Sequence, residues 1–175
     1  NDRGSNPSGS LLQTTNGKMY GMTTGGGNEN LGIIFSFDPV TVTVTKVDDL
    51  DNVNGAVPLG NLVQGNGGLL YGMCANGGGD QSGVIFSFNP GNSTYAKLKD
   101  FDFASGYYPH GSLLAGTDGK FYGMTYKGGN NNEGVLFSFE CSTLTYAKLK
   151  DFDDVNGGEP LGSLVQAADG KIYGM

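Results

Sequence analysis

The stretch Asp118-Gly-Lys-Phe-Tyr-Gly-Met124 decides the fold of this chain, because it returns at a constant spacing. Variants of it occupy residues 16–22, 67–73 and 169–175, so the tripeptide Tyr-Gly-Met recurs every 51 residues. The tripeptide Phe-Ser-Phe keeps the same spacing at residues 35–37, 86–88 and 137–139. A constant period of this length, without insertion or deletion, indicates a tandem array of small structural units.

One unit contains four short runs with β-strand patterns. In the third unit they are residues 112–115, 120–125, 134–139 and 145–150. Asp118 and Gly119 separate the first two runs, and Asp-Gly tolerates the positive φ of a tight hairpin. Val135, Phe137 and Phe139 fall on one face of the third run, since side chains alternate along a strand. Four antiparallel strands in about 50 residues is the size of one propeller blade.

We therefore predict an all-β protein, a β-propeller-type array of four-stranded antiparallel blades. A single repeat array covers residues 1–175, with units at approximately 1–51, 52–102 and 103–153 and an incomplete unit at 154–175. This is fewer than the ~4–8 blades of a closed propeller, and a half unit exposes a strand edge. We expect a fragment of a longer propeller. Closure into a ring by self-assembly is the alternative, and a β-solenoid fits four distinct strands per unit less well.

The tripeptide Tyr-Gly-Met predicts tight packing. A glycine inside a strand weakens the strand unless another backbone comes close. We expect that close backbone near the axis of the array, where radially packed sheets are crowded. The tyrosine and methionine are expected to pack between sheets, with an aromatic cage for a ligand as the minor alternative.

The composition restricts the class of partner. The chain carries a formal net charge of −7 and has a pI near 4.4, whereas nucleic acids and anionic membranes attract basic surfaces. No apolar run approaches the ~18 residues of a membrane span. We therefore expect neither nucleic-acid binding nor membrane insertion. Cys74 and Cys141 are too few for a disulfide scaffold, and we expect both to be free, partly buried thiols.

The segments between units carry an acidic pattern, D-x-D-x-x-[NS]-G. It occurs at residues 49–55, 100–106 and 151–157, the last of which includes Asn156. Calcium loops also alternate oxygen ligands around a turn glycine, but the twelfth position, where an EF-hand has a bidentate Glu, is Gly60, Gly111 or Gly162. The favoured interpretation is an Asx turn, in which the Asp and Asn side chains bond their own backbone.

No residue stands out as catalytic. Asp100 and Asp102 have the residue type for glycoside hydrolysis, but the same pair recurs between all units, whereas a catalytic site normally occurs once. His110 replaces Leu59 and Leu161 of the neighbouring units and has no evident partner, so we expect a solvated loop residue. We assign no catalytic residue, no metal ligand and no cofactor, and we expect that the protein is not an enzyme.

The loops after the second strand of each unit are the candidate binding surface, although no single binding residue is assigned. These loops are polar and differ in sequence: residues 24–30, 75–81 and 126–132. Repeat proteins present binding surfaces as variable loops on a constant framework. Asn-rich loops near Tyr126 suit a sugar or a protein ligand, and plain soluble connectors are the alternative.

The segments GSLVQAADGKIYGM at 162–175 and GGNNNEGVLFSF at 128–139 resemble the GloVer-type tandem repeat. The resemblance spans nearly the whole chain. Such repeats occur in secreted and surface proteins of environmental bacteria, and this version is similar to copies in Bacteroidetes proteins exported by type IX secretion. The resemblance implies an extracellular or outer-surface location in a bacterium and implies no particular activity.

Together these features predict a non-enzymatic secreted or cell-surface repeat module for protein or glycan binding, or adhesion. The expected partners are a protein or glycan at the loops and, through the export route, secretion or surface-anchoring machinery. A structural or passenger segment of a large type IX-secreted protein is the alternative. A hydrolytic propeller enzyme is a further alternative.

Overall fold

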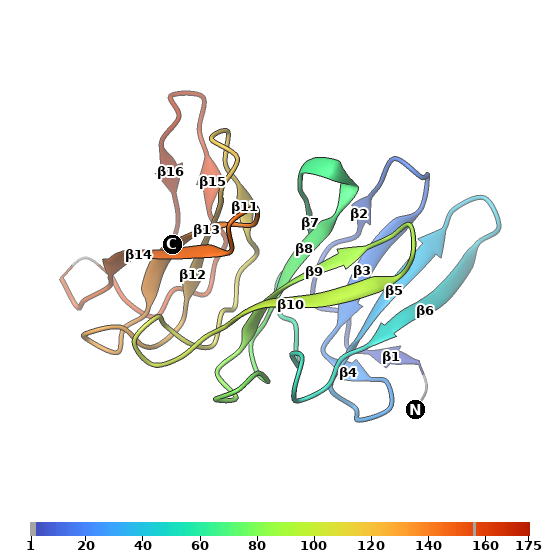
Figure 1. The fold of residues 1–175 in the computed structure, drawn as a ribbon, viewed down its shortest axis with the longest axis horizontal. Coiled ribbons are helices and arrows are strands. Elements are labelled where there is room, and N and C mark those ends of the chain that lie inside the picture. The colour runs from blue at the N-terminus through green and yellow to red at the C-terminus, as the bar shows by residue number, and fades with distance from the viewer. Residues whose placement is uncertain (1–2, 156) are drawn as a thin grey trace.

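The computed structural model describes residues 3–155 and 157–175, and its regular structure is almost entirely antiparallel β-strand. Three four-stranded sheets, called blades I, II and III, follow one another along the chain (Figure 1). Blade I contains β2 (Leu12–Gln13), β3 (Met19–Thr23), β5 (Ile33–Asp38) and β6 (Thr43–Asp49). Blade II contains β7 (Val63–Gln64), β8 (Leu70–Cys74), β9 (Val84–Asn89) and β10 (Thr94–Asp100). Blade III contains β11 (Leu114–Ala115), β12 (Phe121–Thr125), β13 (Val135–Glu140) and β14 (Thr145–Asp151).

Two small sheets accompany the blades. β15 (Val165–Gln166) pairs with β16 (Ile172–Tyr173), and β1 (Gly4–Ser5) pairs with β4 (Gly25–Gly26). A short 3-10 helix, η1 (Asn66–Gly68), forms the hairpin turn between β7 and β8. The predicted all-β, propeller-type array of four-stranded antiparallel blades is confirmed, and the blades do not close into a ring (Figure 1). Among the described residues, no helix has the length and hydrophobicity that a membrane crossing requires.

Each blade pairs its strands in the order of the sequence, and the first and fourth strands are the edges. The first strand is shorter than predicted: only Leu114 and Ala115 of residues 112–115 join the sheet of blade III. Ser112 instead donates its backbone N–H to the Ser163 side chain, 2.9 Å away in the next unit. The first residues of this run therefore contact the next unit and do not join the sheet of their own blade.

The hydrophobic cores lie between successive blades. The face of blade I that carries Tyr20 and Met22 packs against the face of blade II that carries Phe86 and Phe88. The opposite face of blade II packs in the same way against blade III. Blade II is thus covered on both faces, and β9 is buried from residue 84 to residue 88. The prediction that the tyrosine and methionine of Tyr-Gly-Met pack between sheets is confirmed in blades I and II.

The glycine of Tyr-Gly-Met is required for a different reason from the one predicted. Gly72 lies directly opposite Phe86 in the β8–β9 register, and a Cβ on Gly72 would lie 2.6 Å from Phe86 Cζ. The same relation holds for Gly123 and Phe137, at 2.5 Å. The neighbour is therefore an aromatic ring of the adjacent strand within the same blade, and the expectation of a second backbone here is wrong. A ring lying over a cross-strand glycine covers backbone that glycine leaves bare.

Close backbone approach does occur, at the glycine before each first strand. A Cβ on Gly60 would lie 2.4 Å from the carbonyl oxygen of Gly111, and a Cβ on Gly111 would lie 2.1 Å from that of Gly162. The backbones of successive units thus come close together at the glycines found at the twelfth position of the acidic pattern. Any side chain larger than hydrogen would push neighbouring units apart here.

Candidate functional site at the loop rim

Two sets of loops meet at one end of the blades, because antiparallel strands two and four of each blade end there. One set follows β3, β8 and β12, and the other links each blade to the next (Figure 1). We call this surface the loop rim. It consists of residues 24–30, 75–81 and 126–132 and of the linkers 50–59, 101–110, 152–155 and 157–161. Asn156, predicted to belong to the third linker, lies outside the described residues.

The first aspartate of each acidic pattern clamps a loop of its own unit. Asp49 Oδ1 accepts the backbone N–H of Asn28 at 3.1 Å, 21 residues earlier in the chain. Asp100 and Asp151 make the equivalent bonds to Gly79 at 3.0 Å and to Asn130 at 2.9 Å. This contact is tertiary, so the Asx-turn interpretation does not apply to the first aspartate.

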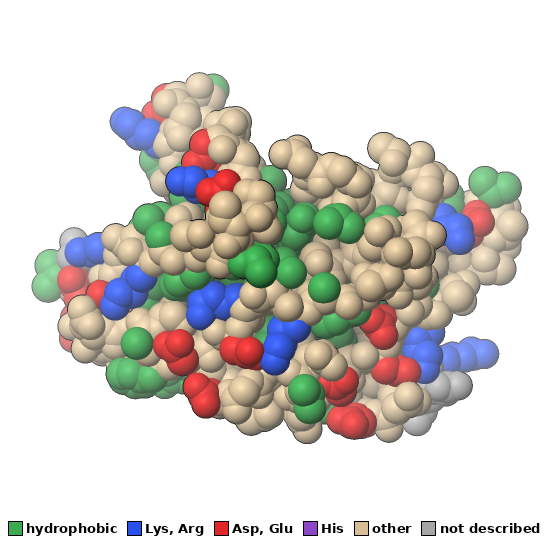
Figure 2. Space-filling model, viewed as in Figure 1, with side chains coloured by type: hydrophobic (Ala, Val, Ile, Leu, Met, Phe, Trp, Pro, Cys, Tyr) green, Lys and Arg blue, Asp and Glu red, His purple; other side chains and the backbone are tan. Residues whose placement is uncertain are grey.

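A lysine three residues earlier pairs with each of these carboxylates. The distances are 2.8 Å for Lys46–Asp49, 2.9 Å for Lys97–Asp100 and 2.8 Å for Lys148–Asp151. In Figure 2, acidic and basic side chains lie side by side over the lower half of the face shown. Partly exposed ion pairs contribute about 0–1 kcal/mol, whereas hydrogen bonds to a charged group contribute about 1.5–3 kcal/mol. The bond to the loop backbone is therefore the larger effect.

The second aspartate of each pattern shapes the linker turn, as the Asx-turn interpretation predicts. Asp51 Oδ1 accepts the N–H groups of Val53 at 2.8 Å and Asn54 at 2.6 Å. Asp102 Oδ1 accepts the N–H of Ser105 at 2.7 Å. Burial raises the pKa of Asp51, but the hydrogen bonds from Asn54 and Val53 outweigh it and leave this pKa below its usual value.

The residue between the two aspartates is apolar and anchors the linker in the core. Leu50 is 2% exposed in the core between blades I and II, and Phe101 is 1% exposed in the core between blades II and III. In the pattern D-x-D, a buried apolar side chain thus lies between two carboxylates. The first carboxylate binds the loop after the second strand, and the second binds the linker turn. Asp100 and Asp102, the pair considered for hydrolysis, are both engaged in this way. The described residues contain no group of three or more His, Cys, Asp or Glu side chains placed to hold a metal ion.

Backbone contacts hold the linkers against the loops that follow β8 and β12. The N–H of Gly78 donates to the carbonyl oxygen of Asn52 at 2.9 Å, and that of Gly129 donates to Phe103 at 2.8 Å. Ala56 forms an antiparallel bridge with Asn76, and Tyr107 forms the same bridge with Lys127. Each of these two linkers is thus held along its length by the loop that follows it in the chain.

One rim position has the same unusual conformation in every unit. Asn6, Val57, Tyr108 and Glu159 all have positive φ, between 51° and 56°. Val57 donates to the carbonyl oxygen of Leu31 at 2.9 Å and accepts from the N–H of Ala75 at 3.0 Å. Tyr108 makes the equivalent two bonds. The left-handed region is unfavourable for a β-branched residue, so the flanking loops impose this conformation.

His110 is not the solvated loop residue that we expected. Its ring is partly buried, with its centroid 5.0 Å from that of Tyr126. Burial lowers the pKa of His110 below its usual value. The sequence gives no reason to pair His110 with Tyr126. The two rings come together only when the linker folds over the loop.

The two cysteines are free thiols, as expected, but they differ in burial. Cys141 is partly buried, whereas Cys74 is 0% exposed in the core between blades I and II. The expectation of a partly buried thiol is therefore wrong for Cys74. Burial raises the pKa of both thiols and makes Cys74 an inert core residue.

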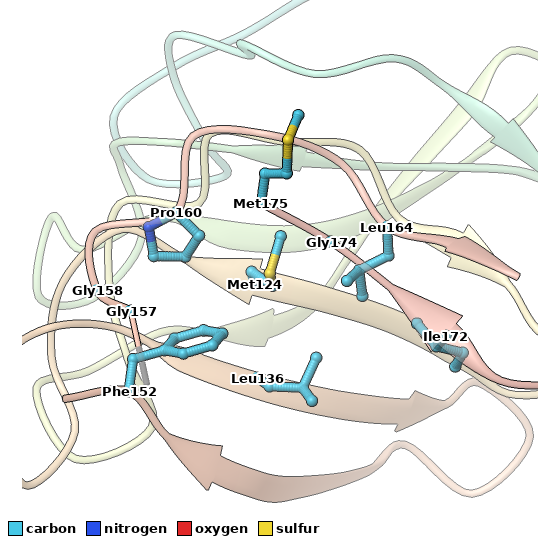
Figure 3. Close-up of a pocket in the computed structure, with 10 residues that line it drawn as sticks. All are labelled: Met124, Leu136, Phe152, Gly157, Gly158, Pro160, Leu164, Ile172, Gly174 and Met175. Atoms are coloured by element: carbon cyan, nitrogen blue, oxygen red, sulfur yellow. The ribbon is translucent and has the colours of Figure 1, made fainter. Parts of the chain in front are cut away.

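A pocket of about 220 Å³ lies between blade III and the β15–β16 sheet (Figure 3). Its apolar walls include Met124, Leu136, Phe152 and Leu164. These positions are 51 residues after Met73, Ile85, Phe101 and Leu113, which belong to the core between blades II and III. The pocket is therefore an inter-blade core position and differs in chemistry from the polar rim.

The comparisons with known proteins agree with the repeat. A family model described as the Gloeobacter/Verrucomicrobia repeat matches residues 1–175. No match to a curated protein was found.

Several solved structures resemble the fold. The extracellular domain of a protein described as a one-component system from B. thetaiotaomicron has a TM-score of 0.65 at 13% identity and matches 99% of this chain. TolB from Acinetobacter baumannii has a TM-score of 0.57 at 14% identity, over 93% of this chain. A puromycin-hydrolyzing peptidase from Mycobacterium tuberculosis has a TM-score of 0.54 at 10% identity, also over 93%. The chain spans only 20%, 37% and 24% of these three structures, and identities this low show the fold alone.

Proposed function

The chain belongs to the Gloeobacter/Verrucomicrobia repeat family, and we propose that it is a non-enzymatic module of a secreted or surface protein that binds a ligand through its loop rim. The ligand class is a glycan or a protein. The location outside a bacterial cell draws support from the extracellular domain among the structural neighbours and from the acidic composition. The finer resemblance, to Bacteroidetes copies exported by type IX secretion, is part of the same proposal.

One observation carries this proposal: the rim keeps a constant backbone while its side chains change. The position occupied by Val57, Tyr108 and Glu159 has the same left-handed φ and the same N–H bond to the preceding loop in each unit. The side chain there is aliphatic, aromatic or acidic. A framework that imposes a costly conformation and varies the residue is typical of a display surface. Core positions such as Phe86 and Phe137, in contrast, repeat without change.

The alternative, a structural or passenger segment, draws support from the serial contacts of Gly60, Gly111 and Gly162, which join units without any need for a ligand. Arrays of purified glycans and of purified extracellular proteins distinguish the two functions. We expect the folded chain to bind members of at least one array. Substitutions in the rim loops, such as Gln81→Ala and Asn131→Ala, should reduce that binding, whereas Val40→Ala in the hairpin at the opposite end should not. Absence of binding on both arrays would support the structural role.

A further inference from the structure

Blade III places a group of aromatic side chains on the loop rim. We call Phe103, Tyr107, Tyr108, His110 and Tyr126 the aromatic cluster. Phe103 is 61% exposed and Tyr108 is 39% exposed. The Phe103 and Tyr107 rings are stacked with centroids 6.1 Å apart, and Tyr107 meets Tyr108 at 4.8 Å. In Figure 2, hydrophobic side chains reach the surface at the lower left, over the loops drawn below β14 in Figure 1.

The repeat framework does not require these aromatic residues. The preceding unit has non-aromatic side chains at all five equivalent positions: Asn52, Ala56, Val57, Leu59 and Ala75. The backbone bridge of Tyr107 with Lys127 is nevertheless the same as that of Ala56 with Asn76. Because the fold forms equally without them, packing does not explain their presence in blade III. A chain of touching rings with exposed members, here Phe103, Tyr107 and Tyr108, is typical of a binding site.

Polar groups surround the cluster at hydrogen-bonding positions. The Tyr107 hydroxyl donates to Asn132 Oδ1 at 3.0 Å, and the Tyr126 hydroxyl donates to Glu159 Oε2 at 3.0 Å. Lys127 pairs with the other oxygen of Glu159. Asn130 and Asn131 are exposed beside them. Rigid rings bordered by hydroxyl and amide groups are complementary to a sugar, which presents both C–H faces and hydroxyl groups.

Charge decides which kind of ligand fits. The Lys127 ammonium, which is paired with Glu159, already lies 5.4 Å from the Tyr126 ring centroid, so a cationic ligand would have to displace it from this ring. An anionic glycan would meet a chain with a net charge of −7. A neutral sugar meets neither penalty, and its weakly positive C–H groups are attracted to the negative faces of the rings.

We propose that the aromatic cluster of blade III is a binding site for a neutral glycan built of pyranose sugars, with Phe103 and Tyr108 as the stacking surfaces. This inference rests on the proposed function and assigns its ligand class and its site. A single ring contact of this kind is expected to change affinity by about tenfold.

Affinity gel electrophoresis of the whole chain tests the site, with soluble xyloglucan, mixed-linkage β-glucan and galactomannan as neutral probes and alginate as the anionic probe. We expect at least one neutral polysaccharide to retard the protein and alginate to have no effect. Phe103→Ala and Tyr108→Ala should each weaken binding about tenfold or more, whereas Tyr108→Phe should retain it. Leu144→Ala is the matched control, because Leu144 is also exposed and also has a left-handed φ but lies in the β13–β14 hairpin at the opposite end of blade III. It should leave binding unchanged. Circular dichroism of each variant verifies the fold, which these exposed side chains do not support.

The outcomes separate the inference from the proposed function. Retardation by a neutral polysaccharide that survives Phe103→Ala and Tyr108→Ala would overturn the site and leave glycan binding by the rim intact. Retardation by alginate alone would overturn the neutral class. No retardation by any polysaccharide, combined with binding to a purified protein that depends on rim residues, would overturn the glycan assignment while the rim would still bind a ligand.

Discussion

Replacing Gly72 by alanine tests the packing that repeats in every blade. The new Cβ would lie 2.6 Å from Phe86 Cζ and 2.9 Å from Phe86 Cε1, far inside van der Waals contact. Phe86 cannot move aside easily, because it is 0% exposed and stacks on Tyr95 with ring centroids 4.9 Å apart. Overpacking a core costs about 1–3 kcal/mol, while removing a glycine from a strand returns about 0.5–1 kcal/mol. We expect a net loss of about 1–2 kcal/mol in the free energy of unfolding.

A second substitution separates the effect of the Phe86 ring from that of the other neighbours of Gly72. Phe86→Leu removes the ring that the alanine would strike, at its own cost of about 1–2 kcal/mol. In that background Gly72→Ala should become neutral or stabilising. The contact that remains, Leu62 Cδ2 at 3.2 Å, is the end of a flexible side chain, and the backbone gain is about 0.5–1 kcal/mol. The coupling between the two substitutions should therefore be about 1–3 kcal/mol and favourable.

Urea unfolding followed by far-UV circular dichroism measures all four proteins of this cycle, with the slope of the transition compared among them. Gly79→Ala is the control, since a Cβ there meets no atom within 4 Å. An equal loss from Gly72→Ala with and without Phe86 would refute the reasoning. It would indicate that a neighbour other than Phe86, such as Leu62 Cδ2 at 3.2 Å, excludes the side chain.

Three further outcomes follow from the same structure. Gly111→Ala would place a Cβ 2.1 Å from the carbonyl oxygen of Gly162. We expect a loss of about 2 kcal/mol or more in the free energy of unfolding, measured in urea. A loss no larger than that of Gly79→Ala would contradict the close approach. Val57→Asn should raise the thermal unfolding midpoint, because asparagine tolerates the left-handed φ of 56°. The expected gain in the free energy of unfolding is up to about 1 kcal/mol. An unchanged or lower midpoint would argue against imposed strain. Burial raises the pKa of Asp102, but hydrogen bonds from Ser105 outweigh burial and leave this pKa lowered in the folded state. The ionised carboxylate therefore stabilises the fold at pH values above its unfolded pKa of about 3.9. This contribution is lost as the pH falls through the folded pKa. The stability difference between the natural chain and Asp102→Asn should therefore be full at pH 6 and shrink as the pH falls below about 3.9 in chemical unfolding. A difference that stays constant as the pH falls through this range would rule out the charge as its source.

The sequence predicts those features that depend on residues close together in the chain. The alternation of Val135, Phe137 and Phe139 predicts one buried face, and all three side chains are 0% exposed. The linker turn around Asp102 is also local, since Asp102 and Ser105 are three residues apart. The role of Asp100 is not predictable in this way, because its loop partner Gly79 lies 21 residues away.

The candidate site shows the same division. Each member of the aromatic cluster is visible as a departure from the repeat, and alignment of Tyr108 with Val57 needs only the period of 51. What the period cannot reveal is contact, such as the 5.0 Å between the rings of His110 and Tyr126. That contact forms because the linker carrying His110 pairs with the loop carrying Tyr126.

The period and the strand patterns by themselves determined the array, its four-stranded blades and the residues of its cores, because alternation and turn chemistry are properties of neighbouring residues. Only the tertiary structure decided which atoms meet. It placed a phenylalanine ring over the glycine of Tyr-Gly-Met, the backbones of successive units against Gly60 and Gly111, and the aromatic side chains of blade III on one rim. These contacts depend on strand register and on the packing of one unit against the next, which no single unit contains.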